Sequence, residues 1–382
     1  MTFSMISPMK VALVHDWLTG MRGGEKCLEV FCELFPSADL YTLVYDSAEV
    51  SPTIKRMNIR ASWINSLPGA RMYFRYLLPF FPRAMEGFDL SGYDLILSSS
   101  HCVAKGIQPH RAQHIAYVYT PMRYIWDMGE AYLNGGASPM ARAGLSLSRA
   151  YLRRWDLGSS ERVDQFIAIS HNVAAKIERI YGRSAKVIYP PVDIAKFRIS
   201  DQVQPYYLIV SALVPYKRID LAVDAFNEIK LPLKIAGDGP LRRFLQRRAK
   251  SNIEFLGWVG DEKLAELYAQ CQALMFPGEE DFGIAPLEAQ ASGRPVIAFD
   301  KGGLCETVIG LDGCSLERRP TGLFFPDQRA DSLIDAIGRY QKNRSAFEPE
   351  QLRRHASSFS RERFKQEIAE YIDTAVELRR NR

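Results

Sequence analysis

The stretch Pro277-Gly-Glu-Glu-Asp-Phe-Gly-Ile-Ala-Pro-Leu-Glu-Ala-Gln-Ala-Ser-Gly-Arg-Pro-Val-Ile-Ala298 decides the fold of this 382-residue chain. It follows the apolar run of residues 273–276, which is typical of a buried parallel strand. Residues 284–292 have helical character, Gly293 is a natural C-cap, and Pro295 opens the next strand. A strand, a glycine-containing loop and a helix N-terminus together form the usual anion site of an α/β sheet.

Two carboxylates stand in this stretch with seven residues between them. Glu280 lies at the mouth of the loop, and Glu288 lies about one turn into the expected helix. From these two elements both side chains can project into one crevice. The plainer interpretation is a solvated helix start, where acidic residues interact favourably with the helix dipole.

Strands and helices alternate through the second half of the chain. Strands are expected at residues 206–211, 233–236, 253–256 and 273–276, with helical patterns between them. Such alternation with short loops predicts a doubly wound parallel sheet. Lys217 falls in a strand-to-helix loop, where its point charge suits a diphosphate, although a solvated lysine is the plainer interpretation.

The first half repeats the arrangement of strand, glycine-rich loop and helix. A strand at residues 10–15 leads through Gly23 and Gly24 into a helical pattern that starts at Lys26. The loop is neither a Walker loop nor a Gly-x-Gly-x-x-Gly fingerprint, and a simple tight turn is the alternative. A second strand is expected at residues 39–45, and a later one, at residues 94–100, ends at His101, which faces the crevice beyond the sheet rather than the core.

Residues 71–83 interleave aromatic and aliphatic side chains with three arginines. Two interpretations stand equal. The segment lies in a membrane interface, with aromatics at headgroup level and arginines toward anionic lipids, or it is a core-packed helix with arginine ends.

The whole-chain numbers predict a globular protein of two domains. The length exceeds one ordinary core, and 47% hydrophobic with 24% charged residues is normal composition. A formal charge of +5 permits attraction to an anionic membrane surface or a diphosphate and proves neither. We expect no transmembrane helix, no signal peptide and no nucleic-acid partner, because none of their patterns is found.

Cysteine usage indicates a reducing compartment. The six cysteines form no Cys-x-x-Cys pair, so we expect reduced thiols in or near the core of a cytosolic enzyme. They are Cys27, Cys32, Cys102, Cys271, Cys305 and Cys314.

The string from Gly278 to Ala298 strongly resembles the Glu-x7-Glu signature of family-four retaining glycosyltransferases. Gly302-Gly303, Gly237-Asp-Gly-Pro240 and Phe255-Leu-Gly257 are further matches, and the resemblance runs from about residue 10 to residue 330. It implies an α/β protein of the GT-B fold, with two Rossmann-like domains facing a cleft. The implied boundaries are residues 1–192 for the acceptor-side domain, 193–360 for the nucleotide-sugar domain, and 361–382 for a helix that returns to the first domain.

The resemblance also implies roles for individual residues. Catalytic roles go to His101, Glu280 and Lys217. Donor binding goes to Gly23, Gly24, Lys217, Arg218, Gly257, Phe282, Gly283, Ile284 and Glu288, with Glu288 on the ribose hydroxyls. Acceptor binding goes to Arg123, Tyr124 and Asp127. Two positions depart from the family pattern, because Ala212 stands where an arginine is often found and Tyr119 where a histidine often precedes Thr-Pro.

Metal-independent transfer fits the absence of an Asp-x-Asp motif, so no metal and no cofactor are expected beyond the nucleotide-sugar co-substrate. The segments around Asp16-Trp, Thr120-Pro-Met-Arg and Val214-Pro-Tyr-Lys-Arg most resemble bacterial mannosyltransferases of O-antigen and exopolysaccharide assembly. The expected reaction is therefore α-mannosyl transfer from GDP-mannose to a lipid-linked saccharide, with retention of configuration. A front-face route needs no enzymic nucleophile, and double displacement is its competitor.

Three alternatives stay open at this point: a UDP-sugar donor, a GT-B-fold sugar-nucleotide epimerase, and a catalytically silent binding subunit. The expected location is the cytoplasm, with peripheral contact on the inner face of the cytoplasmic membrane through residues 71–83 as one interpretation.

Overall fold

The computed structural model describes residues 9–126, 139–313 and 319–380. The chain divides into two compact units: unit 1 contains Met1–Pro190 with Phe364–Arg382, and unit 2 contains Pro191–Arg363. Each unit is built on one parallel β-sheet, in agreement with the predicted GT-B class.

Unit 1 has a seven-stranded sheet in the order β3-β2-β1-β4-β5-β6-β7. The strands are β1 (Val11–His15), β2 (Asp39–Thr42), β3 (Asn58–Ala61), β4 (Leu95–Ser100), β5 (Gln113–Val118), β6 (Gln165–Ala168) and β7 (Ala185–Val187). The strand order reverses between β1 and β4, which are hydrogen-bonded to each other. Such a switch point leaves a crevice beyond the carboxyl ends of the two strands.

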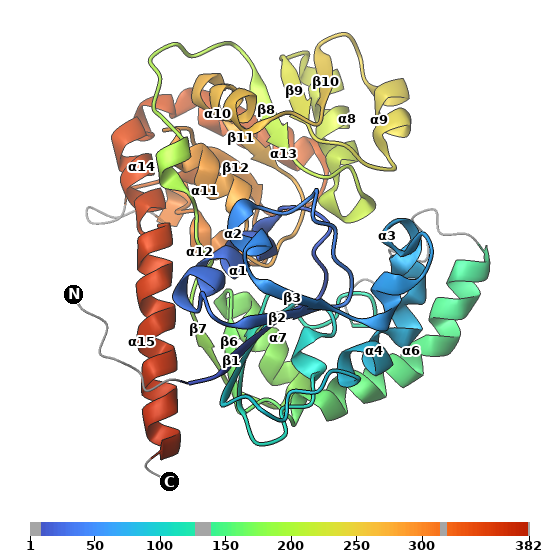
Figure 1. Cartoon of the computed structure of the whole chain (residues 1–382). Helices are drawn as coiled ribbons and strands as arrows, with labels where there is room; N and C mark the ends of the chain where they lie inside the picture. Colours follow the sequence, from blue (N-terminus) through green and yellow to red (C-terminus); the bar gives the residue numbers. More distant parts are fainter. Residues whose placement is uncertain (1–8, 127–138, 314–318, 381–382) are drawn as a thin grey trace. The chain divides into compact units, whose positions relative to one another are not determined.

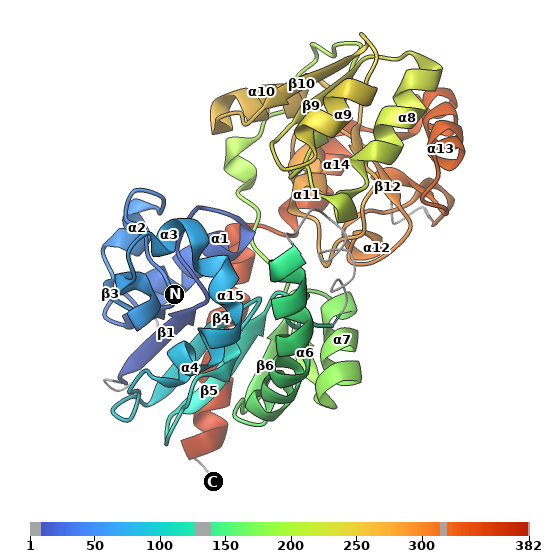
Figure 2. The same cartoon turned by 90° about the vertical axis from the view of Figure 1, so that its right-hand side faces the viewer.

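Helices pack against this sheet: α1 contacts β1 and β4, and Figure 2 shows α6 and α7 side by side next to β6. They are α1 (Gly23–Leu34), α2 (Pro52–Lys55), α3 (Ala70–Tyr73), α4 (Phe81–Glu86), α6 (Pro139–Ser160) and α7 (His171–Tyr181). Short 3-10 helices are η1 (Trp63–Ser66), η2 (Phe74–Phe80) and η3 (Ala104–Gly106). Ser170 caps the N-terminus of α7, since its hydroxyl accepts from the Val173 amide at 3.1 Å.

Strand β3 and helix α6 are among the elements of unit 1 that were not predicted. Strand β3 is an edge strand with alternating exposed and half-buried residues, so it lacks the apolar run that marks the central strands. Helix α6 opens at Pro139, a residue that favours the first turn of a helix, so a start signal was present in the sequence and was missed.

The C-terminal helix α15 (Arg361–Arg380) joins unit 1, as predicted for residues 361–382. The Phe364 ring lies 5.8 Å from that of Phe31 and 5.6 Å from that of Tyr117. Farther along the helix, the Gln113 side-chain amide donates to the Ala375 carbonyl at 3.0 Å. Helix α15 is the red helix of Figure 1.

Unit 2 has a six-stranded sheet in the order β10-β9-β8-β11-β12-β13. The strands are β8 (Tyr207–Val210), β9 (Leu233–Ala236), β10 (Ile253–Gly257), β11 (Leu274–Phe276), β12 (Val296–Phe299) and β13 (Gly322–Phe325). All pairings are parallel, and the strand order reverses between β8 and β11. The predicted alternation is confirmed.

The helices of unit 2 follow the strands one by one. They are α8 (Ile219–Ile229), α9 (Arg242–Arg248), α10 (Asp261–Gln270), α11 (Ile284–Ala291), α12 (Leu304–Thr307), α13 (Ala330–Lys342) and α14 (Pro349–Ser357). The 3-10 turns are η4 (Ile194–Lys196), η5 (Pro215–Lys217), η6 (Leu311–Gly313) and η7 (Arg344–Ala346).

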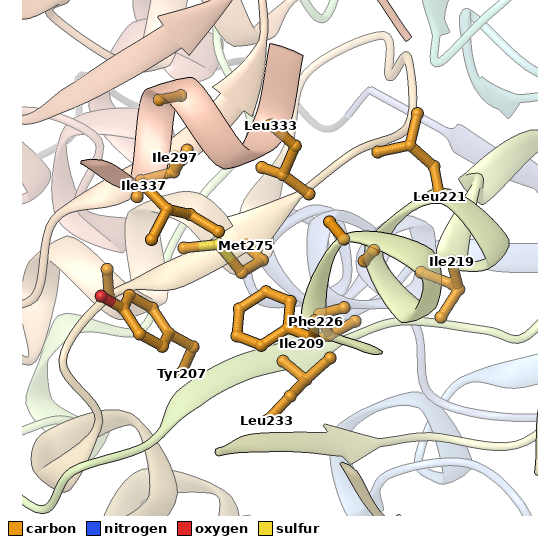
Figure 3. Packing of buried hydrophobic residues seen from close by; sticks show 14 of the residues in the cluster. Tyr207, Ile209, Ile219, Leu221, Phe226, Leu233, Met275, Ile297, Leu333 and Ile337 are labelled. Atoms are coloured by element: carbon orange, nitrogen blue, oxygen red, sulfur yellow. The ribbon is translucent and has the colours of Figure 1, made fainter. Parts of the chain in front are cut away.

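The core of unit 2 explains why its strands are apolar without interruption. Met275 of β11 packs with Phe226 and Leu333 on one face of the sheet (Figure 3), whereas its neighbours Leu274 and Phe276 belong to the cluster on the other face. Both faces are therefore covered, and successive side chains of one strand are all buried.

Among the described residues, the cysteines are buried as predicted, with one exception. Four free thiols are buried, and Cys305 is exposed. Cys314 lies outside the described residues.

Candidate functional site

His101 is held by a buried carboxylate at the switch point of unit 1. Asp16 follows β1 and accepts hydrogen bonds from the backbone amides of residues 101 to 104 at 2.7, 3.0, 2.6 and 2.8 Å. The same carboxylate lies 3.1 Å from Nδ1 of His101, whose side chain is 28% exposed. The His101 and Trp17 rings form a T-shaped pair, with 4.4 Å between their centroids. The ring is thus fixed in position while part of it reaches solvent.

The electrostatics around His101 favour a neutral ring with its proton on Nδ1. Burial lowers the pKa of His101, and the Asp16 carboxylate opposes this shift without cancelling it. A proton on Nδ1 points to Asp16, so Nε2 retains a lone pair. That nitrogen can accept a hydrogen bond or a proton from a hydroxyl group.

Asp16 was not among the predicted site residues, although its segment carried part of the family resemblance. The signal available in the sequence was a carboxylate directly after a buried strand. Its partners lie 85 to 88 positions away, so only the pairing of β1 with β4 brings them together.

A hydrogen-bonded chain connects Gly24 to the same region. The Tyr119 hydroxyl donates to the Gly24 carbonyl at 2.9 Å and lies 2.8 Å from the Ser99 hydroxyl. Ser99 in turn lies 3.0 Å from Nδ1 of His15. Tyr119, which departs from the family pattern, therefore has a structural role: it holds the start of α1.

The N-terminus of α1 is already partly occupied by a negative group. Helix α1 begins at Gly23, and the Glu25 carboxylate accepts from the Arg22 amide at 2.9 Å. Burial raises the pKa of Glu25, but the neighbouring His15, whose Nε2 lies 3.8 Å from a Glu25 oxygen, outweighs it, and the net pKa is lowered. A phosphate at this turn would meet an ionised carboxylate, which weakens the anion site expected from Gly23 and Gly24.

The predicted acceptor residues lie in a loop that is anchored from behind. Arg123 and Tyr124 are half-buried, and the Arg123 charge adds to the burial that lowers the pKa of His101. The next residues are fixed by α6: the Trp126 indole donates to Asp156 at 2.7 Å, and Arg153 donates to the Ile125 carbonyl at 2.9 Å. Asp127, the third predicted residue, lies outside the described residues.

In unit 2 the structure brings Lys217 and Glu280 together as an ion pair. Lys217 follows β8 and Glu280 follows β11, the two strands at the switch point. Their side chains are only 16% and 15% exposed, so the charges are shielded yet accessible. A Cβ atom on Gly278 would lie 2.9 Å from the Lys217 Cα atom, which explains the glycine that lets the two loops touch.

Gly302 and Gly303 hold the Glu280 loop from the other side. The Gly303 amide donates to the Glu280 carbonyl at 2.7 Å. Gly302 has φ +74°, and a Cβ atom there would stand 2.4 Å from the same carbonyl oxygen. The loop then enters α11 through Phe282, which packs against Phe359, and through Gly283 with φ +94°. Ile284 is the first residue of α11.

Glu288 is a buried carboxylate that accepts a hydrogen bond from an uncharged hydroxyl group. It lies in the second turn of α11, and its Oε2 accepts from the Tyr268 hydroxyl at 2.9 Å. Burial and the Glu288 charge raise the pKa of Tyr268 well above its ordinary value, so this phenol stays a donor. Tyr268 was not predicted as a site residue, because its place in α10 resembles any apolar helix position.

Two further donor candidates flank this pair. Arg218 has φ +52°; its Nε lies 3.3 Å from Asp220, and one terminal nitrogen lies 3.4 Å from Gln328. Gly257 ends β10 with φ +71°, and its carbonyl accepts from the Gly237 amide at 2.7 Å. None of these hydrogen bonds joins Arg218 or Gly257 to Glu280 or Glu288. Within residues 9–126, 139–313 and 319–380, no group of three or more potential metal ligands is found.

Comparison with known proteins gives matches across most of the chain. A profile described as "Glycosyltransferase Family 4" matches residues 40–196, and one described as "Glycosyl transferases group 1" matches residues 193–363. An uncharacterized glycosyltransferase of Methanocaldococcus jannaschii, MJ1178, is 32% identical over 180 residues, which are 46% of this chain and 50% of that protein. The O-antigen chain mannosyltransferase C of Escherichia coli is 27% identical over 199 residues, 47% of this chain and 52% of that one.

The chain thus spans about half the length of the curated relatives it matches. Among solved structures, Anabaena Alr3699/HepE in complex with UDP and glucose superimposes with a TM-score of 0.67. That likeness has 18% sequence identity and covers 96% of this chain and 99% of the other, so it describes the fold alone.

Proposed function

Because the chain belongs to glycosyltransferase family four, we propose that it transfers a hexose from a nucleotide sugar to a saccharide acceptor, with retention at the anomeric carbon. The observation that carries the proposal is the Lys217–Glu280 ion pair at the switch point of unit 2. A nucleoside diphosphate sugar needs a cation for its phosphates and a carboxylate for its hydroxyls, and this pair offers both.

The predicted donor-binding residues of unit 2, apart from Ile284, receive roles in this proposal. The diphosphate replaces Glu280 as the partner of Lys217. Arg218 and the amides of Phe282 and Gly283 complete the compensation of the phosphate charge. They act in place of the arginine that the family often has at the position of Ala212. Glu280 is then released to the donor sugar. Glu288, which accepts from Tyr268, also accepts from the ribose hydroxyls. The base rests against the backbone after Gly257.

The proposed step is a front-face substitution. The acceptor hydroxyl oxygen bonds to the anomeric carbon, the bond from that carbon to the diphosphate oxygen breaks, and the hydroxyl proton passes to the leaving phosphate. The amides and cations of unit 2 stabilise the charge that develops on the leaving group. In this scheme His101 hydrogen-bonds a sugar hydroxyl through Nε2, while Arg123, Tyr124 and Asp127 bind the acceptor.

We further propose GDP-mannose as the donor and a lipid-linked saccharide of cell-surface polysaccharide or lipopolysaccharide synthesis as the acceptor. The support is the sequence resemblance and the mannosyltransferase among the relatives. A UDP-sugar donor is the principal competitor. An epimerase gains no support, and the paired Lys217 and Glu280 argue against a silent binding subunit. A cytoplasmic location at the inner face of the membrane goes with such an acceptor.

Thermal shift with GDP, UDP and ADP, first without metal and then with it, tests the donor. A nucleotide at one hundred times its Kd should stabilise its unit by about 2.7 kcal/mol. Stabilisation by GDP alone, independent of metal, supports the proposal. A response to UDP alone replaces the donor, and silence toward all three nucleotides contradicts nucleotide-sugar binding altogether. Glu288→Ala is the companion variant, since loss of the ribose contact should weaken the response.

A further inference from the structure

The helical run formed by α3, η2 and α4 turns an apolar face to the outside of unit 1. Its buried side is regular: Ala70, Phe74, Leu78 and Phe81 recur at spacings of four, four and three residues and belong to the core. The interpretation of residues 71–83 as a core-packed helix is thus correct for one side of the run. The other side is then free to meet a partner.

The outward side carries large apolar residues where a surface helix normally carries charges. Met72, Tyr76 and Phe80 recur at spacings of four residues, and 85%, 75% and 53% of their surface is exposed. Their exposed fractions, rather than their spacing, place these side chains on the outside, since η2 is a 3-10 helix with three residues per turn. Large apolar side chains that gather exposed in one segment mark an interaction surface.

Trp63 enlarges this surface. It lies in η1, which contacts α3, and it is 46% exposed. Of the eleven large apolar residues that are exposed in the described part of the chain, four fall between residues 63 and 80. We call Trp63, Met72, Tyr76 and Phe80 the apolar face. Met72 lies in α3, and Tyr76 and Phe80 lie in η2, which contacts α6 within unit 1.

The charge of the chain is concentrated in the same segment. Between Glu49 and Glu86 there is no acidic residue, and there are six basic ones, whereas the formal net charge of the whole chain is +5. All other residues together are therefore net −1. The six are Lys55, Arg56, Arg60, Arg71, Arg75 and Arg83. Arg71 lies 3.2 Å from Asp46 and is still 57% exposed, and Arg75 lies over the Phe74 ring at 4.9 Å.

We propose that the apolar face docks on an anionic lipid surface. Tyr76 and Trp63 suit the headgroup level, Met72 and Phe80 insert among the acyl chains, and the arginines contact lipid phosphates. A nucleic acid or an acidic peptide would account for the arginines, but not for Met72 and Phe80. Among the residues that the structure describes, no helix is long and apolar enough to cross a bilayer, so the contact is peripheral.

This inference rests on the proposed function in one respect, since a lipid-linked acceptor is what makes membrane contact useful. Docking would bring unit 1, with His101 and the anchored loop of residues 119–126, to the surface that carries the acceptor. Binding to lipid itself requires no donor, no acceptor and no turnover, so it can be measured separately.

The test is cosedimentation of the full chain with vesicles of phosphatidylcholine alone and of phosphatidylcholine with phosphatidylglycerol. The wild-type chain should bind the anionic vesicles. The triple variant M72S/Y76S/F80S should lose binding by about tenfold or more, because the inserted apolar groups are gone. The variant R71Q/R75Q/R83Q should lose about fivefold per arginine, on anionic vesicles only, with the loss diminishing as salt is raised.

Helix α9 supplies matched controls, because it also carries an exposed phenylalanine among exposed arginines. F244S and R243Q/R247Q should bind vesicles like the wild type. Retained unfolding temperatures and nucleotide responses would show that the variants are folded. Failure of the wild type to bind anionic vesicles overturns the proposal, as does equal loss in the α9 variants. Vesicle binding without nucleotide response would refute the proposed function and leave this inference intact.

Discussion

At the scale of single residues, the buried carboxylate Asp16 positions His101. Its four backbone amide donors fix the loop after β4, and its charge keeps the pKa of His101 from falling further. The variant Asp16→Asn keeps the shape but removes the charge. Because the pKa of His101 then falls, the acidic limb of a pH–rate profile that depends on neutral His101 should move to lower pH. An acid limb that stays in place would exclude this coupling.

The stability of Asp16→Asn should fall as well. Each hydrogen bond from an amide to a carboxylate contributes about 1.5–3 kcal/mol at most to the free energy of unfolding. We expect Asp16→Asn to lower that free energy by about 3 kcal/mol. Urea unfolding measures it. The control is Asp89→Asn, since Asp89 is an exposed residue of the same unit.

A buried histidine predicts how stability depends on pH. His114 lies at the start of β5, and burial lowers its pKa to about 4. The unfolded chain therefore binds more protons than the folded one below pH of about 6.5, and stability falls as the pH drops from there toward 4. The full effect is roughly 3 kcal/mol. Urea midpoints between pH 7 and 5 should decline, and His114→Asn should flatten that decline.

Gly24 offers a test of close ligand approach. A Cβ atom at this position would lie 3.5 Å from the His15 and Tyr119 rings, an ordinary contact, and φ at Gly24 is not positive. Gly24→Ala should therefore fold with a change within about 1 kcal/mol. If the donor phosphates approach this backbone, the rate of sugar transfer should fall, while the stability of the chain without nucleotide should not change. Unchanged transfer would assign Gly24 to the turn alone.

At the scale of elements, the loop from β11 to α11 depends on the glycines that follow β12. In Gly302→Ala the new Cβ atom would clash with the Glu280 carbonyl, and φ +74° is strained for any side chain. We expect a loss of about 1–3 kcal/mol, together with a weaker nucleotide response. Denaturant unfolding and thermal shift measure the two. Gly338→Ala, in the middle of α13 with open space around it, should instead stabilise by about 0.5–1 kcal/mol.

At the scale of the whole molecule, α15 completes the core of unit 1 from the far end of the chain. Phe364 is fully buried against Phe31 and Tyr117. Phe364→Ala should cost about 3–5 kcal/mol. Leu378→Ala, on the exposed side of the same helix, should change stability by less than about 0.5 kcal/mol. Equal small effects in the two variants would mean that α15 is not part of the folded core.

The elements themselves could be predicted from the sequence, because their signals are local. Uninterrupted apolar runs followed by glycine loops and helical spacing indicated the parallel sheets, whereas the return of α15 was implied by the family resemblance. Strand β3 was not predicted because an edge strand lacks such a run, and helix α6 was missed although Pro139 marks its start. The motif of residues 277–303 also indicated the loop that the structure places at the β8–β11 switch point.

The sequence by itself thus determined the fold class, the order of elements and the place of the Glu280 loop. Only the tertiary structure decided which side chains meet: Asp16 with His101, Lys217 with Glu280, and Tyr268 with Glu288. The physical reason is that periodicity and turn chemistry act over a few residues, whereas these contacts join residues 20 to 85 positions apart. Such contacts depend on strand order and on how helices pack on the sheet, and no local pattern encodes either.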